Sequence, residues 1–180
     1  MKIGVINGSI RSGRTSEAVT SWVMDNIGGR EHDYELIDLK DFDLPMYSGA
    51  GLPMRMDKQY DSPEVTRWSQ AIDACDAFIL ITPEYNHSVP AAMKNAVDSI
   101  GPEWVGKPIA FVGYGPMGAI RAIEHWRQIM ANFHMHDIRE QLGFVAGMEM
   151  RDGFTPMDFR KKELDTMLDR LEAMTQQLAK

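Results

Sequence analysis

Cysteine is almost missing from this chain of 180 residues, since Cys75 is the only one. A single thiol can form neither an intramolecular disulfide framework nor a thiolate-rich zinc or iron–sulfur site. Redox chemistry in this chain would therefore need a bound cofactor. Cys75 falls on the apolar stripe of a predicted helix, which indicates a core residue and not a catalytic thiolate.

Long hydrophobic runs are missing as well. The longest uninterrupted apolar segment is Ala77–Ile81, far shorter than the roughly 20 residues that a membrane-spanning helix needs. The N-terminal stretch MKIGVINGSIRS is interrupted by Asn7 and Gly8, so it is too short and too polar for a signal-peptide core. We therefore expect a cytoplasmic protein.

Positively charged residues are fewer than negatively charged ones: the chain has 19 lysines and arginines and 26 aspartates and glutamates, for a net charge of −7. This balance argues against broad binding to nucleic acids or anionic membranes. A hydrophobic content of 44% is enough to bury a sizeable core. The chain contains no internal repeat and no Pro/Ser-rich linker, so we expect one domain over residues 1–180.

Short segments rich in β-branched and aromatic residues alternate with segments of helical spacing. Strands are predicted at Lys2–Asn7, Tyr34–Leu39, Asp76–Thr82 and Pro108–Gly113, and a fifth, without a clear period, within Met135–Val145. Amphipathic helices are predicted around residues 19–27, 65–75, 93–100, 119–133 and 164–178. This alternation predicts right-handed βαβ units and a mainly parallel sheet covered on both faces.

Ligands of an open parallel α/β sheet bind beyond the carboxyl ends of its strands, which selects three loops. The first, Asn7–Glu17, combines two glycines, four hydroxyl side chains, two arginines and a helix start. Such a set suits a phosphate monoester, although Thr15 or Ser16 serving merely as a helix cap is the alternative. Gly8 and Gly13 fit neither a Walker motif nor GxGxxG, which disfavours nucleoside triphosphates and a dinucleotide pyrophosphate.

The second and third loops suit a planar ring. In Pro83–Pro90, two prolines restrict the backbone, and Asn86 offers donors and acceptors to a heterocycle. His87 has no identifiable carboxylate partner, so hydrogen bonding is favoured over general-base catalysis. Gly113–Ala119 contains three glycines, which allow a flat ligand to approach the backbone, and Tyr114 could lie against its ring. The alternative is that this turn only starts a helix.

Other chemistry finds no support in the sequence. The histidines form no HExxH pair and there is no GxSxG nucleophile elbow, so we predict neither a metal site nor a catalytic side chain. Residues 43–60 form the one long segment without a period. Loops of this length serve as lids or interface elements about as often as they are plain surface excursions.

Together the three loops resemble the NADPH-dependent FMN reductase family, which includes flavin, quinone, chromate and azo-dye reductases. The similar segments are GSIRSGRTSEAV, PEYNHSVPAAMKNAVDSI and FVGYGPMGAIRAIEHWRQI. The resemblance implies a flavodoxin-like three-layer αβα sandwich with a five-stranded parallel sheet in the order 2-1-3-4-5. Many relatives have a Gly-Gly pair where this chain has Gly118-Ala119 or Gly115-Pro116.

The resemblance also implies a cofactor, FMN, with NAD(P)H as co-substrate. By position in the motifs, the phosphate cradle is Ser9, Arg11, Thr15, Ser16 and Glu17, with Arg14 nearby and Glu17 acting through its backbone N–H. The residues that contact the isoalloxazine ring are Pro83, Glu84, Tyr85 and Asn86, with Tyr114 and Gly115 on its far side.

The function implied is that of an FMN-dependent NAD(P)H oxidoreductase. It passes a hydride from NAD(P)H through flavin N5 to a quinone, free flavin or similar small acceptor, and the family implies a homodimer or homotetramer. The main alternative is a flavodoxin-type electron carrier that does not oxidise NAD(P)H directly, although the first loop lacks the T-x-T-G-N pattern of flavodoxins. A third hypothesis is a regulatory or interaction protein that has the same fold but binds no cofactor.

Overall fold

Five parallel strands form one sheet in this computed structural model, which describes residues 1–179. They are β1 (Lys2–Asn7), β2 (Asp33–Asp38), β3 (Ala77–Pro83), β4 (Pro108–Gly115) and β5 (His136–Val145). Their order is β2-β1-β3-β4-β5, and every neighbouring pair is parallel. The flavodoxin-like order implied by the resemblance is confirmed.

Three predicted strand ends are wrong: β3 ends at Pro83 and not at Thr82, and the ends of β4 and β2 differ for reasons of pairing and capping. β4 continues to Gly115 because Gly113 and Tyr114 pair with β3 on one side and β5 on the other. The third loop therefore starts at Pro116 and not at Gly113. β2 stops at Asp38, whose side chain accepts a hydrogen bond from the backbone N of Lys40 at 3.0 Å and starts a short 3-10 helix.

The five predicted helices are confirmed. They are α1 (Ser16–Asn26), α2 (Pro63–Asp73), α3 (Ala91–Asp98), α4 (Ile120–Ala131) and α6 (Arg160–Leu178). A short α5 (Ala146–Glu149) was not predicted. Ser62 caps α2, since its Oγ accepts from the backbone N of Val65 at 3.3 Å and Pro63 occupies the first turn.

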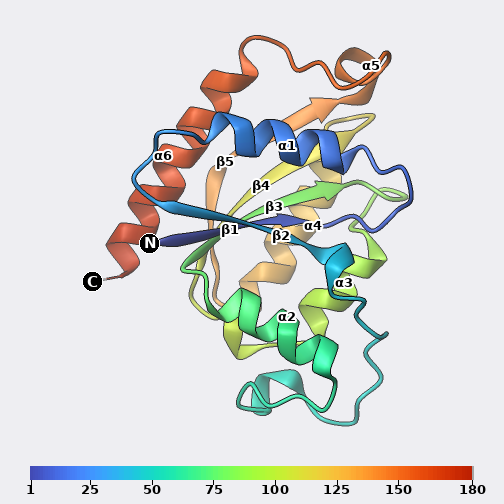
Figure 1. The fold of residues 1–180 in the computed structure, drawn as a ribbon, viewed down its shortest axis with the longest axis vertical. Helices are drawn as coiled ribbons and strands as arrows, with labels where there is room; N and C mark the ends of the chain where they lie inside the picture. Colours follow the sequence, from blue (N-terminus) through green and yellow to red (C-terminus); the bar gives the residue numbers. More distant parts are fainter. Residues whose placement is uncertain (180) are drawn as a thin grey trace.

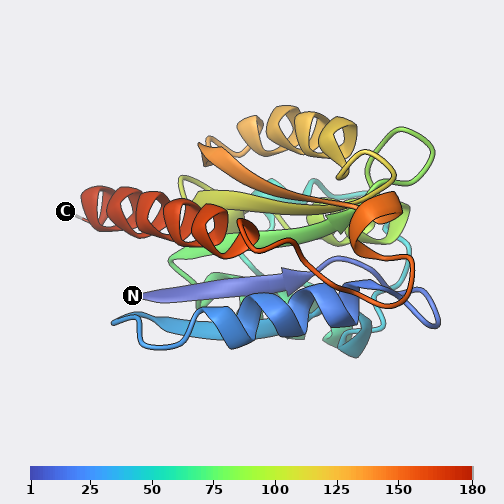
Figure 2. The ribbon, with the colours of Figure 1, turned by 90° about the horizontal axis from the view of Figure 1, so that it is seen from above.

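The helices cover both faces of the sheet. One buried cluster joins Val19 and Val23 of α1 to Leu164 and Leu168 of α6 across the strands, and the other contains Trp68, Met93 and Trp126 of α2, α3 and α4. Figure 1 accordingly shows α2 and α3 on the side opposite α1 and α6, and Figure 2 separates α1 from α4 by the strands.

The carboxyl ends of all five strands meet at one edge of the sheet. In Figure 2 the strand arrows point to the same side, and the N-terminus lies at the other. β1 pairs with both β2 and β3, so the chain reverses its winding direction at β1, and the crevice expected at such a switch point lies beyond β1 and β3. None of the helices in residues 1–179 is long and apolar enough to span a membrane.

The long segment 43–60 is held against the rest of the protein. It contains a 3-10 helix, Pro53–Arg55, and its end is held by the buried carboxylate of Glu103. That carboxylate accepts hydrogen bonds from Tyr60 Oη at 2.9 Å, Ser69 Oγ at 2.5 Å and the backbone N of Gly101 at 3.0 Å. The segment is thereby pinned to α2 and to the connection after α3.

Candidate functional site

The three loops selected from the sequence meet at the carboxyl edge of the sheet. The hydroxyls of Ser9 and Tyr85 lie 3.2 Å apart and join the first loop to the second. A Cβ placed on Gly115 would lie 3.9 Å from the Cβ of Glu84, so the second and third loops are neighbours too. Residues separated by more than 70 positions thus line one site.

The start of α1 offers unsatisfied donors. Thr15 occupies the N-cap position but makes no side-chain capping bond, and the Oγ of Ser16 is buried with no hydrogen-bond partner among residues 1–179. The capping alternative is therefore wrong. A buried hydroxyl without a partner is costly, and an uncapped helix N-terminus attracts anions. Both features fit a phosphate group.

The backbone of the first loop lies close to the sheet because residue 8 is glycine. A Cβ at Gly8 would lie 2.9 Å from the carbonyl oxygen of Ile81, which already accepts a hydrogen bond from the N of Gly8 at 3.0 Å. Arg11 is exposed, and its guanidinium carbon lies 5.8 Å from the centre of the Tyr85 ring. It can therefore reach an anion held at this edge.

Arg14 has a different role from that of a phosphate ligand. Its buried guanidinium binds both carboxylate oxygens of Asp38, with Nη1 at 2.7 Å from Oδ1. It also donates to the backbone O of Ser9. The hydrogen bond to Asp38 raises the pKa of Arg14. Glu17 adds a contact to Arg14 Nε at 3.1 Å, and its backbone N donates to the carbonyl of Arg14 at 3.4 Å, a long bond that a phosphate can replace. Arg14 therefore ties the first loop to the end of β2.

Removing the partner of Arg14 should destabilise the protein. We expect Asp38→Ala to lower the free energy of unfolding by about 2 to 3 kcal/mol, because it leaves a buried guanidinium with only an exposed carboxylate beside it. Urea denaturation at neutral pH measures the change. The matched control, Asp41→Ala in the adjacent exposed turn, should change it by less than about 0.5 kcal/mol. Equal effects of the two variants would contradict this role for Arg14.

The second loop is rigid because of a tight turn more than because of its prolines. Tyr85 and Ser88 exchange backbone hydrogen bonds of 3.0 Å in both directions. Between them, Asn86 and His87 have φ angles of 48° and 72°, the positive values that a type I′ turn requires at both central positions. Asparagine tolerates this conformation well, which explains its place at the tip.

A branched residue at the tip should therefore loosen the loop. We expect Asn86→Val to lower the free energy of unfolding by about 1 to 2 kcal/mol, whereas Asn86→Gly should leave it nearly unchanged. Thermal unfolding of both variants measures the difference. If valine and glycine behaved alike, the turn would not have the backbone conformation described here.

Two residues that the sequence analysis did not select hold the second loop in place. His125 Nδ1 lies 2.8 Å from Ser88 Oγ, and Arg121 forms an ion pair with the nearly buried carboxylate of Glu84. Burial alone would raise the pKa of Glu84, but Arg121 and the backbone N–H groups at the start of α4 outweigh it and lower that pKa. The ion pair uses Oε1 of Glu84, and Oε2 is buried without a hydrogen-bond partner among residues 1–179. The only signal in the sequence is that Arg121 and His125 are four residues apart, which places both on the same face of α4.

The glycines of the third segment serve two purposes. A Cβ at Gly113 would lie 2.4 Å from the carbonyl O of Gly118, and one at Gly118 would lie 3.0 Å from Gly143, so both allow backbones to pack together. A Cβ at Gly115 would only touch Glu84 and Ala119, at 3.9 Å, so this position is not tightly packed. Ala119 adopts a φ of 56°, a conformation that glycine adopts more readily than alanine.

Comparisons with known proteins agree with this geometry. The family model described as NADPH-dependent FMN reductase matches residues 1–149. The chain belongs to the NADPH-dependent FMN reductase family. It is 34% identical over 157 residues to the NAD(P)H-dependent FMN reductase ntnL of Nectria sp., covering 83% of this chain and 78% of that protein.

Two further similar proteins match nearly the whole length of this chain. It is 28% identical to the 2-hydroxy-1,4-benzoquinone reductase of Burkholderia sp., with 96% of this chain and 95% of that protein covered. The solved structure of FerB, a flavoenzyme NAD(P)H:(acceptor) oxidoreductase from Paracoccus denitrificans, superposes with a TM-score of 0.73 at 26% identity and covers 96% of this chain and 97% of that one.

The residues present fit the FMN of the family. Ser16 supplies a free buried hydroxyl for the phosphate, and Gly8 keeps the first loop close to the sheet. Burial raises the pKa of the Tyr114 phenol and outweighs the nearby hydroxyls of Ser9 and Ser16, which lower it, so Tyr114 remains a protonated donor at neutral pH. His87 is exposed at the turn, whereas Cys75 is a core residue as predicted, and burial raises its pKa to about 11.

Proposed function

We propose that this chain is an FMN-dependent NAD(P)H oxidoreductase that reduces quinones, free flavin and similar small acceptors. The observation that carries the proposal is the buried, unpartnered hydroxyl of Ser16 at the uncapped start of α1, beside two loops that suit a ring. Bound FMN would take two electrons from a nicotinamide and pass them on, which no side chain of the protein can do.

The chain's own residues bind and orient the cofactor. Ser9, Arg11, Thr15, Ser16 and the backbone N–H of Glu17 hold the phosphate in this proposal. The turn from Pro83 to Asn86 contacts one side of the ring, and Tyr114 with Gly115 lies on the other. The proposal needs no side-chain nucleophile, because bound FMN would supply the redox chemistry. The carboxylate of Glu84 forms an ion pair with Arg121.

The proposed acceptor range rests on the names of the relatives. Their names include FMN reductase and a benzoquinone reductase. We extend the proposal to a cytoplasmic homodimer or homotetramer, since Leu52, Met54 and Met117 expose large apolar side chains that a partner subunit can cover. Light scattering coupled to size-exclusion chromatography tests the oligomeric state.

Steady-state oxidation of NADH and NADPH against quinones, free flavin and oxygen tests this function, with the bound flavin extracted and identified. We expect FMN in the extract and quinone-dependent oxidation of at least one nicotinamide. A protein that stayed colourless with added FMN and oxidised neither nicotinamide would refute the proposal.

A further inference from the structure

One helix, α4, is attached to the second loop at both ends of the loop. Near its start, Glu84 forms an ion pair with Arg121. Near its end, Ser88 Oγ lies 2.8 Å from Nδ1 of His125, one turn further along the same face of α4. Between these two points, Tyr85 and Ser88 exchange backbone hydrogen bonds in both directions, so the turn is held as one unit.

The same helix is fixed to the two strands that lead into the site. Nε1 of Trp126 donates to Oγ1 of Thr82 in β3 at 3.0 Å, and both residues are fully buried. α4 follows β4 through a turn in which the backbone N of Gly118 donates to the carbonyl of Gly115 at 3.1 Å. α4 therefore sets the position of the second loop relative to Gly115, which lies on the other side of the ring in the proposed function.

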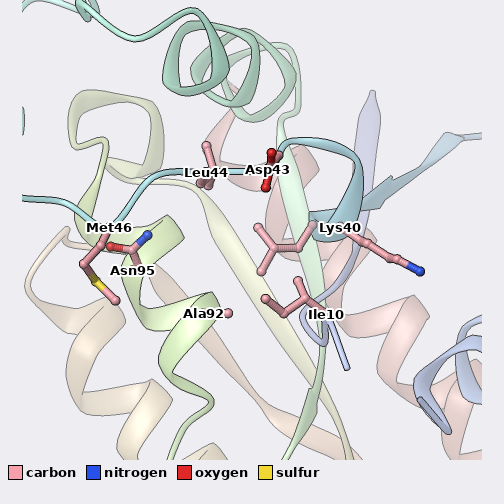
Figure 3. Close-up of a pocket in the computed structure, with 8 residues that line it drawn as sticks. Ile10, Lys40, Asp43, Leu44, Met46, Ala92 and Asn95 are labelled. Carbon is pink, nitrogen blue, oxygen red and sulfur yellow. The ribbon is translucent and has the colours of Figure 1, made fainter. Parts of the chain in front are cut away.

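The second loop is packed less closely where it leads into α3. Ala92, in the first turn of α3, lines a cavity of about 410 Å³ that also borders the first loop. Figure 3 shows Ile10 and Leu44 around the same space, beside the start of this helix. Close packing on that side therefore does not replace the attachment to α4.

We propose that His125 is a positioning residue for the flavin ring, and that it acts by holding Ser88. The inference rests on the proposed function, because it takes the second loop to contact the isoalloxazine ring of FMN. Ser88 closes the turn whose other residues face the ring, so the hydrogen bond from α4 fixes the whole turn before any flavin binds. Such a preformed loop binds its ligand more tightly, since less ordering remains to be done on binding.

Fluorescence titration of the apoprotein with FMN and with riboflavin tests this role. His125→Ala should weaken the binding of both flavins by about fivefold, the usual worth of one hydrogen bond, because the two ligands share the ring. His125→Asn keeps a polar atom near the place of Nδ1 and should restore both affinities to within about twofold. Gln128→Ala, at an exposed position of the same helix, should leave both unchanged.

The partner of His125 gives a second variant for the same test. Ser88→Ala removes the same hydrogen bond with a smaller change of side chain, so it should weaken both flavins as His125→Ala does. The double variant should bind them no more weakly than either single variant, since only one interaction is lost.

Amide hydrogen exchange in the apoprotein tests the attachment without any flavin. The backbone N–H of Ser88 should exchange about fivefold faster in His125→Ala than in the original protein, and Gln128→Ala should leave its rate unchanged.

The inference would be overturned if His125→Ala left the affinity for both flavins unchanged, or if His125→Asn were as weak as His125→Ala. It would also be overturned if His125→Ala weakened FMN but not riboflavin, since the effect would then act at the phosphate. The expected flavin affinities in a protein that oxidised neither NADH nor NADPH would support the role of His125 and refute only the proposed reaction. The two failures are therefore distinguishable.

Discussion

Replacing Ser16 by aspartate is expected to weaken FMN binding by about a hundredfold or more. The new carboxylate would lie where the phosphate of FMN binds in the proposed site, and two like charges a few ångströms apart repel by several kcal/mol near a protein surface. The helix dipole favours an acidic side chain in the first turn of α1, but position 16 is fully buried and an unpaired carboxylate there costs stability. Circular dichroism and thermal unfolding therefore establish first that the variant is folded. Fluorescence titration of the apoprotein with FMN measures the loss.

Riboflavin and a second variant make this result specific. Riboflavin lacks the phosphate, so its affinity for Ser16→Asp should fall far less than that of FMN. Ser21→Asp introduces the same charge on the exposed side of the same helix and should leave FMN affinity within about twofold of the original. If Ser16→Asp weakened riboflavin and FMN equally, the phosphate would not lie at the start of α1.

Glu149→Gln is expected to cost the largest amount of stability, about 3 kcal/mol of unfolding free energy. Glu149 is fully buried and pairs with Arg160, which donates from Nε and Nη2 at 2.9 Å to its two oxygens. The same carboxylate accepts from the backbone N of Val145 at 2.9 Å and of Met157 at 3.1 Å, so it holds the segment between β5 and α6. Removing one partner of a buried pair leaves the other charge uncompensated.

The control uses the other acid that binds the same arginine. Glu163 lies 2.7 Å from Nη1 of Arg160 but is half-exposed, so Glu163→Gln should cost less than about 1 kcal/mol. Chemical denaturation of both variants compares the two costs. A larger loss in Glu163→Gln than in Glu149→Gln would contradict the assignment of the buried pair.

This pair also sets a pH dependence. Burial alone would raise the pKa of Glu149, but hydrogen bonds from Arg160 and from two backbone N–H groups outweigh it and lower that pKa. A carboxylate with a lowered folded pKa stabilises the protein fully above its unfolded pKa, roughly 4.3, and the contribution is lost as the pH falls through the folded value. The stability gap between the original protein and Glu149→Gln should therefore shrink below about pH 4.

Hydrophobic periodicity was sufficient to predict the sheet and its helices, because periodicity reports which face of each element is buried. Ala77, Phe78, Ile79, Leu80 and Ile81 are all buried in β3, as a continuous apolar run in a parallel sheet requires. β5 lies at the edge of the sheet with only one neighbour, and its half-buried residues gave no clear period. The end of β4 was missed because its pairing partners, not its own glycines, decide where it stops.

The candidate site was predictable at the level of loops but not of contacts. The position of Ser16 after β1 and of Tyr85 after β3 follows from the strand rule alone. That Arg14 would turn to Asp38 depends on β2 lying beside β1, and that Glu84 would pair with Arg121 depends on how α4 packs. Neither ion pair can be read from the residues near it in the sequence. The roles of these charged residues therefore needed the tertiary structure.

The reaction of bound flavin with NADPH tests the central claim most directly. The FMN-loaded protein is mixed rapidly with NADPH without oxygen, and the flavin absorbance is followed before and after a quinone is added. We expect the absorbance to bleach within seconds or faster and to return when the quinone is added. A protein that holds FMN but does not bleach with NADPH or NADH would be an electron carrier, and the account of an oxidoreductase would be wrong.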